Sequence, residues 1–400
     1  MKRDNNTEKL NLFKKIILGI QMLCVAFGAI VLVPLLVGID PSIALFTAGC
    51  GTLIFHLITK GKVPIFLGSS FVFIAPVIKA IELYGYPGAL GGIMAVGLTY
   101  MIVSLIVRQK GIEFIQKIFP AVVIGPVIMT IGLALAGVGI NMASSNWFLA
   151  GVSLMTAILV VIFGKKTIKL LPVIIGMSVG YLVAVIFKKI DFSPIINAPW
   201  FSLPAFSAPV FNISAILFLV PVAIAPIIEH IGDIYAISKV AKKDFVKDPG
   251  IKKTLLGDGF ATFFSGLFGG TPVTTYSEVT GAITLTKITD PFILRIAATT
   301  AIVLAFIGKM SGFLRTIPEA VLGGIMILLF GMITIVGIKT IIDSKVDLNK
   351  TKNMVIVSVM LILGVGGAAI SFGQSFSLGS IALSSVVGVL LNWILPDKEN

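Results

Sequence analysis

The sequence predicts an all-α polytopic membrane protein with fourteen transmembrane spans, arranged as two inverted repeats of seven. Hydrophobic residues make up 57% of the 400 residues, charged residues make up 12%, and the mean hydropathy is +1.07. Water-soluble domains of this size are far less apolar. Apolar segments of about 20 residues, the length that crosses a bilayer as a helix, recur along the whole chain. Segments in the second half also resemble segments in the first.

Fourteen candidate spans can be placed in order along the chain. They lie near residues 14–34, 41–59, 65–80, 87–107, 114–135, 147–163, 168–187, 209–235, 254–268, 271–286, 291–308, 317–337, 353–371 and 378–395. The third and tenth candidates are too short for a complete helical crossing. Both begin with strand-favouring residues, IFLGSSFVF and TPVTTYS. We therefore expect a short β-strand followed by a half-helix in each of these two spans.

The basic residues are distributed unevenly between the two sides of the membrane. If the N-terminus is cytoplasmic, the loops on the outer side hold few of the 31 lysines and arginines, namely Lys79, Lys188, Lys189, Lys309 and Arg315. Cytoplasmic loops carry an excess of Lys and Arg, so both termini are predicted to be cytoplasmic, in the cytoplasmic membrane. The net charge of +13 does not indicate nucleic-acid binding, because the basic residues form short clusters between apolar spans.

The chain also contains an internal repeat. Residues 119–140, FPAVVIGPVIMTIGLALAGVGI, resemble residues 317–338, IPEAVLGGIMILLFGMITIVGI. The two short spans have a similar separation, since Gly68 begins the polar part of one and Gly270 that of the other. A repeat of seven spans must have inverted topology because seven is odd, and transporters of this plan place the substrate site near the midplane. Alternatively, the segments resemble one another only in composition.

A polar segment, GGTPVTTYSEVTG at Gly269–Gly281, lies between two strongly apolar segments. At membrane depth such a segment is tolerated only where it lines a cavity. Glu278 is therefore a candidate site residue, near the positive end of a half-helix; the alternative is a structural N-cap. Gly269 and Gly270 allow close backbone approach. Phe71, in the other short span, could offer its ring face and a free backbone amide.

A second group of acidic residues lies in the apolar segments before Gly269. Glu229 and Asp233 are four residues apart and share one helix face, where two buried acids repel each other and favour sharing a proton. We expect Glu229 and Glu278 to form the floor of a substrate site in a transporter. Asp258, in LLGDGFATFFSG, is expected to give a supporting hydrogen bond, and His230 to be a packing residue. Alternatively, the acids are held by buried partners for packing alone.

Several motifs resemble those of bacterial uracil permeases in the nucleobase–ascorbate transporter (uracil/xanthine permease) family, over nearly the whole chain. They are FLGSSFVF, EHIGD, KKDFVKDPG, LGDGFATFFSGLFGGTPVTTYSE and IIDSKVDLNK. The resemblance implies a core domain and a gate domain, a homodimer and proton symport. The core would comprise residues 14–107 and 209–308 and the gate residues 108–190 and 317–395, after a cytoplasmic N-terminus at residues 1–13.

The resemblance also implies roles for individual residues. Glu229 and Glu278 would bind a nucleobase, with backbone amides near Phe71 and Ser277 contributing and Tyr276 in the same substrate-binding set. Glu278 is the leading candidate for the proton carrier. Asp233 and Glu229 are further candidates for proton coupling, and Asp258, Gly269, Gly270 and Thr275 are expected to support the site. No metal or cofactor is expected beyond the coupling proton, although carboxylates and unwound carbonyls also suit sodium.

The expected function is proton-coupled import of a nucleobase, with uracil as the substrate and no nucleic-acid partner. Met22 after Gln21, Asp233 and Ser277 depart from the uracil pattern, and Asp233 makes xanthine or another purine an alternative. An anion transporter of the same fold is a second alternative, although carboxylates would repel an anion. A sensor that does not transport is a third. An enzyme is not expected, because metal-ligand spacing, a nucleophile elbow and a phosphate-binding loop are all missing from the sequence.

Overall fold

The computed structural model describes residues 11–165, 168–372 and 376–396, and most of them are helical. Within these residues, six helices are long and apolar enough to cross a membrane. They are α1 (Leu12–Val37), α2 (Pro41–Ile58), a 3-10 turn running into α3 (Phe71–Lys110), α5 (Ala121–Ser144), α9 (Ile213–Leu219) running into α10 (Ile224–Ala241), and α15 (Glu319–Asp343). Shorter apolar helices are α6 (Trp147–Phe163), α7 (Pro172–Ile186), α13 (Pro291–Ala305), α16 (Thr351–Val365) and α17 (Ser380–Ile394). Of two further helices, α11 (Ile251–Phe268) ends directly before the polar segment, and α12 (Ser277–Thr286) begins within it.

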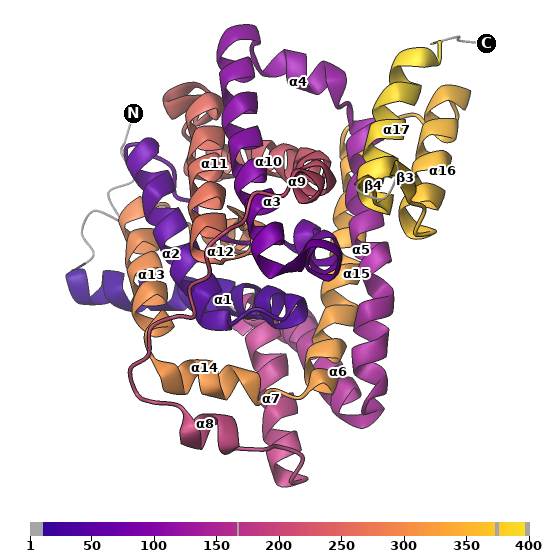
Figure 1. Ribbon diagram of the computed structural model, residues 1–400. Helices are drawn as coiled ribbons and strands as arrows, with labels where there is room; N and C mark the ends of the chain where they lie inside the picture. The colour runs from indigo at the N-terminus through magenta and orange to yellow at the C-terminus, as the bar shows by residue number, and fades with distance from the viewer. Residues whose placement is uncertain (1–10, 166–167, 373–375, 397–400) are drawn as a thin grey trace.

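The helices pack as two groups, which Figure 1 shows side by side. In the first group, α11 packs against α2 and α3, and α13 packs against α1 and α2. In the second group, α5 packs along α15 and α16, and α6 lies against α7 and α15. The two segments that resemble each other in sequence are the long helices α5 and α15, which are direct neighbours.

The two short strands predicted in the third and tenth spans are confirmed. β1 (Leu67–Ser69) and β2 (Val273–Thr275) pair in antiparallel fashion, with Gly68 opposite Thr274. The outer edge of each strand is bonded by a threonine hydroxyl from a neighbouring helix. Thr52 on α2 accepts from the N–H of Leu67 at 2.9 Å, and Thr262 on α11 donates to the carbonyl of Val273 at 2.7 Å. These hydroxyls satisfy backbone groups that lipid could not.

Each strand is followed by a helix, as expected. β1 leads through a 3-10 turn at Phe71–Phe73, η1, into α3 (Ile74–Lys110), which is broken at Gly85, where φ is +72°. β2 leads through Tyr276 into α12. Both helices therefore begin beside the strand pair, inside the first group of helices.

Two predicted span boundaries are wrong. The span expected at 353–371 ends at Val365, because two glycines follow and Gly367 has φ of +71°. The chain then forms β3 (Ile370–Phe372), which pairs with β4 (Phe376–Leu378). The span expected at 114–135 is divided between α4 (Ile112–Ile118) and α5, because extended backbone at Pro120 precedes α5.

Two short helices, which the sequence did not predict, lie in the connections between the two groups. α8 (Ser193–Asn197) precedes α9, and α14 (Gly308–Arg315) joins α13 to α15. They pack against each other and lie near the lower edge of Figure 1. Residues 1–10 of the expected cytoplasmic N-terminus lie outside the described residues.

Candidate functional site

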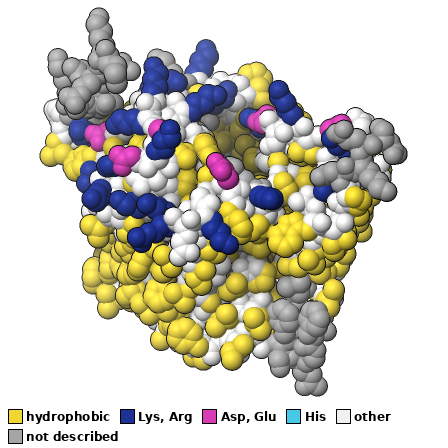
Figure 2. Space-filling view, turned by 90° about the horizontal axis from the view of Figure 1, so that it is seen from above, with side chains coloured by type: hydrophobic (Ala, Val, Ile, Leu, Met, Phe, Trp, Pro, Cys, Tyr) yellow, Lys and Arg dark blue, Asp and Glu magenta, His cyan; other side chains and the backbone are white. Residues whose placement is uncertain are grey.

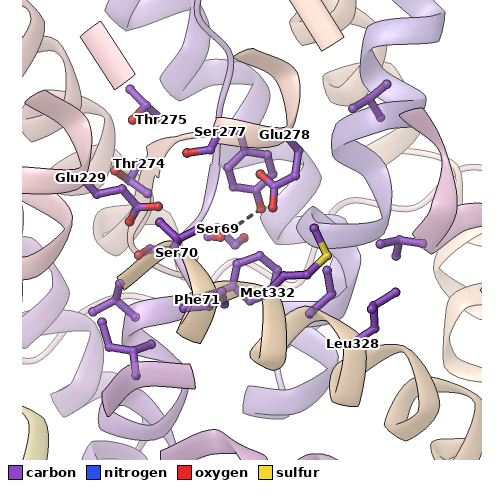
Figure 3. A pocket seen from close by; sticks show the side chains of 18 of the residues that line it. Ser69, Ser70, Phe71, Glu229, Thr274, Thr275, Ser277, Glu278, Leu328 and Met332 are labelled. Carbon is purple, nitrogen blue, oxygen red and sulfur yellow. Dashed lines mark hydrogen bonds between the residues drawn. The ribbon is translucent and has the colours of Figure 1, made fainter. Parts of the chain in front are cut away.

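A cavity of about 310 Å³ lies between the two groups of helices. The first group contributes β1 and η1, β2 and the start of α12, and parts of α1 and α10. The second group contributes parts of α5, α7 and α15. Figure 3 shows the lining side chains from close by. The cavity therefore lies at the boundary between the two groups of helices, at the ends of both short strands.

The polar side chains of the cavity all come from the first group. Glu229 on α10 and Glu278 on α12 both line it, and Glu278 is exposed to the cavity. The hydroxyl of Ser70, which directly follows β1, is buried and has no hydrogen-bond partner among the described residues. The described lining residues include two carboxylates and no Lys or Arg. This half can accept hydrogen bonds from a ligand, and the Ser70 hydroxyl can donate one.

The opposite wall of the cavity is apolar. It is formed by side chains of α5, α7 and α15, among them Ile128, Ile131, Leu328 and Met332. Figure 3 shows Leu328, Met332 and Phe71 beside the labelled polar side chains. A wall of this kind excludes water and packs against the face of a flat ligand, while the polar half sets its orientation.

Tyr276 is held in place by the neighbouring strand. Its backbone N–H donates to the carbonyl of Phe66 at 3.1 Å, and its hydroxyl donates to the carbonyl of Ser69 at 2.9 Å. Its ring lies so close to Gly68 that a β-carbon there would overlap it. Tyr276 therefore lines the cavity with a side chain whose hydroxyl is already used within the protein.

Asp233 lies one turn after Glu229 on α10, and its carboxylate is bonded to β2 and α12. Its carboxylate accepts hydrogen bonds from the hydroxyls of Thr275 at 2.6 Å and Ser277 at 2.8 Å. Within the described residues, Glu229, Thr275 and Ser277 line the cavity and Asp233 does not. The sequence predicted a common face for the two acids. In the structure, two hydroxyls bind Asp233, whereas Glu229 lines the cavity.

Asp258 and His230 form a buried pair behind the strands. Asp258 Oδ2 lies 2.9 Å from His230 Nδ1 and also accepts from the Thr274 hydroxyl at 3.4 Å. The other ring nitrogen of His230 lies 2.9 Å from the hydroxyl of Thr254. These contacts join α10, α11 and β2 and place both residues outside the described cavity lining.

The remaining predicted residues are split between the cavity and its support. Phe71 and Ser277 line the cavity at the first residues of η1 and α12. Gly269 ends α11 with φ of +92°, where only glycine is unstrained. A β-carbon on Gly270 would overlap the hydroxyls of Ser265 and Thr47. Both glycines thus support the polar segment from outside the cavity.

Sequence reasoning missed Ser70 and the apolar wall. Ser70 directly precedes Phe71 and is one of only two polar side chains in the FLGSSFVF motif, so the motif could have indicated it. The wall residues of α5 and α15 carry no such signal, because apolar residues fill every span of this chain.

A family model described as the Permease family matches residues 13–372. The chain belongs to this family, the uracil/xanthine permeases. The resemblance seen in the motifs is thereby confirmed. The chain is a multi-pass membrane transporter and not an enzyme, as the sequence predicted.

Several curated relatives match nearly the whole chain. A protein named probable uracil permease from Pasteurella multocida is 47% identical over 396 residues, covering 97% of this chain and 95% of that protein. The uracil permease of Bacillus caldolyticus is 43% identical over 398 residues, covering 96% and 92%. The uracil permease of Escherichia coli K12 is 38% identical over 399 residues, covering 97% and 92%.

Solved structures show the same fold at low sequence identity. The transmembrane domain of the cyanobacterial bicarbonate transporter BicA has a TM-score of 0.65 at 16% identity, covering 98% of each chain. The murine anion transporter Slc26a9 has a TM-score of 0.71 at 12% identity, covering 96% of this chain and 68% of that chain. The predicted fold class, a helical polytopic membrane protein, is confirmed.

Proposed function

We propose that this protein is a symporter that imports uracil together with protons across the cytoplasmic membrane by alternating access. The observation that carries the proposal is the pair of carboxylates, Glu229 and Glu278, that face one cavity between the two helix groups. Relatives named uracil permease, 38% to 47% identical over nearly the full chain, support uracil as the substrate.

The chemistry of the cavity suits a uracil ring. Uracil presents alternating N–H donors and C=O acceptors, so an ionised carboxylate can accept from an N–H, and a protonated carboxyl can donate to a carbonyl. Glu229 binds the base, and Glu278 is the leading proton carrier. The Ser70 hydroxyl and the backbone amides at Phe71 and Ser277 supply further donors. A buried site of this kind rejects ligands that leave one of its polar groups unpaired.

We infer that the two helix groups are a core domain and a gate domain, each built from segments of both inverted repeats. The core comprises residues 14–107 and 209–308, and the gate comprises residues 108–190 and 317–395. The packing of α5 on α15 and the pairing of β1 with β2 support this division, because each pair joins corresponding segments of the two halves. Motion of the core against the gate would open the cavity to either side, and the protein would act as a homodimer.

Two alternative substrates are less well supported by the cavity. Asp233 was the reason to consider a purine, but both of its carboxylate oxygens already accept hydrogen bonds from the hydroxyls of Thr275 and Ser277. An inorganic anion would meet the carboxylates of Glu229 and Glu278 with no Lys or Arg among the described lining residues. Like charges in such a site repel.

Uptake of radiolabelled uracil tests the proposal in cells that lack their own permease, with an inward proton gradient and unlabelled xanthine as competitor. We expect uptake that a protonophore abolishes and that excess xanthine leaves unchanged. Competition by xanthine equal to that by uracil would contradict the assigned substrate. Uptake that is insensitive to the protonophore but dependent on sodium would contradict proton coupling.

A further inference from the structure

Asp233 holds the junction between β2 and α12 from both sides. It lies one turn after Glu229 on α10, and it is 7% exposed. Thr275, which donates to one carboxylate oxygen at 2.6 Å, is the last residue of β2. Ser277, which donates to the other oxygen at 2.8 Å, is the first residue of α12. A single side chain thus connects α10 to the end of the strand and to the beginning of the helix.

The residue between these two hydroxyls is fixed from the opposite direction. Tyr276 is bonded to Phe66 through its backbone N–H and to Ser69 through its hydroxyl. Three consecutive residues are therefore anchored immediately before Glu278. The direction in which Glu278 enters the cavity, and the direction of the N–H groups that begin α12, depend on these anchors.

We propose that Asp233 is a positioning residue of the substrate site, which orients Glu278 and the first turn of α12 through the hydroxyls of Thr275 and Ser277. It neither touches the substrate nor carries the transported proton. The inference rests on the proposed function, because it concerns the same site. It also gives Asp233 a role different from the proton coupling that the sequence suggested.

The hydrogen bonds explain why an acid suits this position. A buried carboxylate is stable only when its oxygens are bonded, and hydroxyl donors to a charged acceptor make strong bonds. The same helix carries Glu229 one turn earlier, so the connection fixes the two cavity carboxylates relative to each other. The titratable groups around Asp233 are Glu229 and His230 on α10 and Glu278 on α12. Of these, Glu229 and Glu278 face the cavity.

Asp233→Asn separates positioning from proton transfer. The amide oxygen of Asn can accept from one hydroxyl, and its NH₂ group can donate to the oxygen of the other, so both bonds can persist without a carboxyl group. We expect this variant to keep the KM for uracil within about twofold and to keep the wild-type pH profile of uptake. Loss of proton-driven accumulation, or a changed pH profile, would show that Asp233 carries a proton and would overturn the proposal.

Removing either partner of the hydrogen bond should weaken substrate binding. Asp233→Ala and Ser277→Ala should each raise KM about tenfold, since a lost bond to a charged group costs more than a neutral one. The double variant should be no worse than Asp233→Ala, because both changes remove the same connection. Thr284→Ala is the matched control, since its hydroxyl bonds only the carbonyl of Thr280 within α12. If the increases in KM from Asp233→Ala and Ser277→Ala multiplied in the double variant, the proposal would be contradicted.

Thermal unfolding of the same purified variants distinguishes failure of this inference from failure of the proposed function. If the wild type takes up no uracil, the substrate assignment fails. The connection is then judged by the melting temperatures alone. If the falls in melting temperature caused by the Asp233 and Ser277 variants are not additive in the double variant, the connection is supported. Fully additive falls refute it.

Discussion

In the proposed mechanism, Glu278 is the side chain that couples transport to protons. It is exposed to the cavity at the first turn of α12, where its carboxylate can take up a proton from the cavity or release one into it. Glu278→Gln keeps the size and polarity of the side chain but cannot take up a proton. We therefore expect it to abolish accumulation of uracil against a gradient while uracil exchange between the two sides continues.

Accumulation by Glu278→Gln is measured with a proton gradient imposed, and exchange is measured without one. Glu82→Gln is the control, because Glu82 is an exposed carboxylate paired with Lys79 outside the cavity. If Glu278→Gln still accumulated uracil with the pH dependence of the wild type, Glu278 would not be the carrier.

The sequence predicted that two acids in apolar spans would lie at one site, and both of them line the cavity. Glu229 and Glu278 were recognised because an acid in an apolar span is costly and needs a function. The hydrogen-bond partners of Asp233 could not be predicted, because the position of a residue on a helix face does not reveal which hydroxyl will meet it. Asp233 and Ser277 both depart from the uracil permease pattern, and only the structure shows that they are hydrogen-bonded to each other.

Among the elements, the strand pair depends on hydroxyls supplied by neighbouring helices. Thr52 bonds both the N–H and the carbonyl of Leu67, at 2.9 and 3.3 Å. Thr52→Val has nearly the same shape but leaves these buried groups unpaired, which costs about 1–3 kcal/mol. We expect a lower melting temperature for purified Thr52→Val. Thr99→Val, which loses only a bond within α3, is the control, and equal melting temperatures of the two variants would contradict the prediction.

A second element-level contact fastens α14 to the start of α2. Asp40 accepts hydrogen bonds from Ser42 and Ser311 and lies 2.6 Å from Arg315. Burial raises the pKa of Asp40, but these hydrogen bonds and the charge of Arg315 outweigh it, so the pKa is lowered overall. A lowered folded-state pKa stabilises the protein above the unfolded value of about 3.9, and the stabilisation is lost as pH falls through the folded value.

Asp40→Asn keeps a cap for α2 but removes the charge. It should therefore melt below the wild type at pH 7, and the difference should close as the pH falls below about 4. Melting curves across this pH range measure it, with the exposed Asp343→Asn as control. A difference that persisted unchanged in acid would mean that ionisation of Asp40 contributes nothing.

The elements were predicted to different extents for identifiable reasons. The short strands were predictable because IFLGSSFVF and TPVTTYS begin spans that are too short for a helical crossing and are rich in strand-favouring residues. β3 and β4 were missed because the apolar composition around Ile370 continues that of α16. α8 and α14 were missed because short connecting helices are set by packing against each other, which sequence periodicity does not record.

At the scale of the whole molecule, charge and apolar surface indicate how the protein sits in a membrane. Figure 2 shows Lys and Arg side chains gathered over one part of the visible face and hydrophobic side chains covering much of the rest. The excess of basic residues in alternate loops predicts cytoplasmic termini.

Single cysteines test this orientation in a background with Cys24→Ser and Cys50→Ser. Lys189 and Lys243 are both exposed and lie in loops predicted to face opposite sides. A membrane-impermeant maleimide should label Lys189→Cys in intact cells, and Lys243→Cys only after permeabilisation. The reverse pattern would invert the predicted topology.

The central claim is that the carboxylates of one cavity bind uracil, and calorimetric titration of the purified protein with uracil tests it most directly. We predict that the wild type binds uracil and that Glu229→Gln binds at least about tenfold more weakly, because a hydrogen bond to a charged group is lost. The exposed Glu113→Gln should bind like the wild type. Unchanged uracil affinity in Glu229→Gln, or no binding by the folded wild type, would contradict this account.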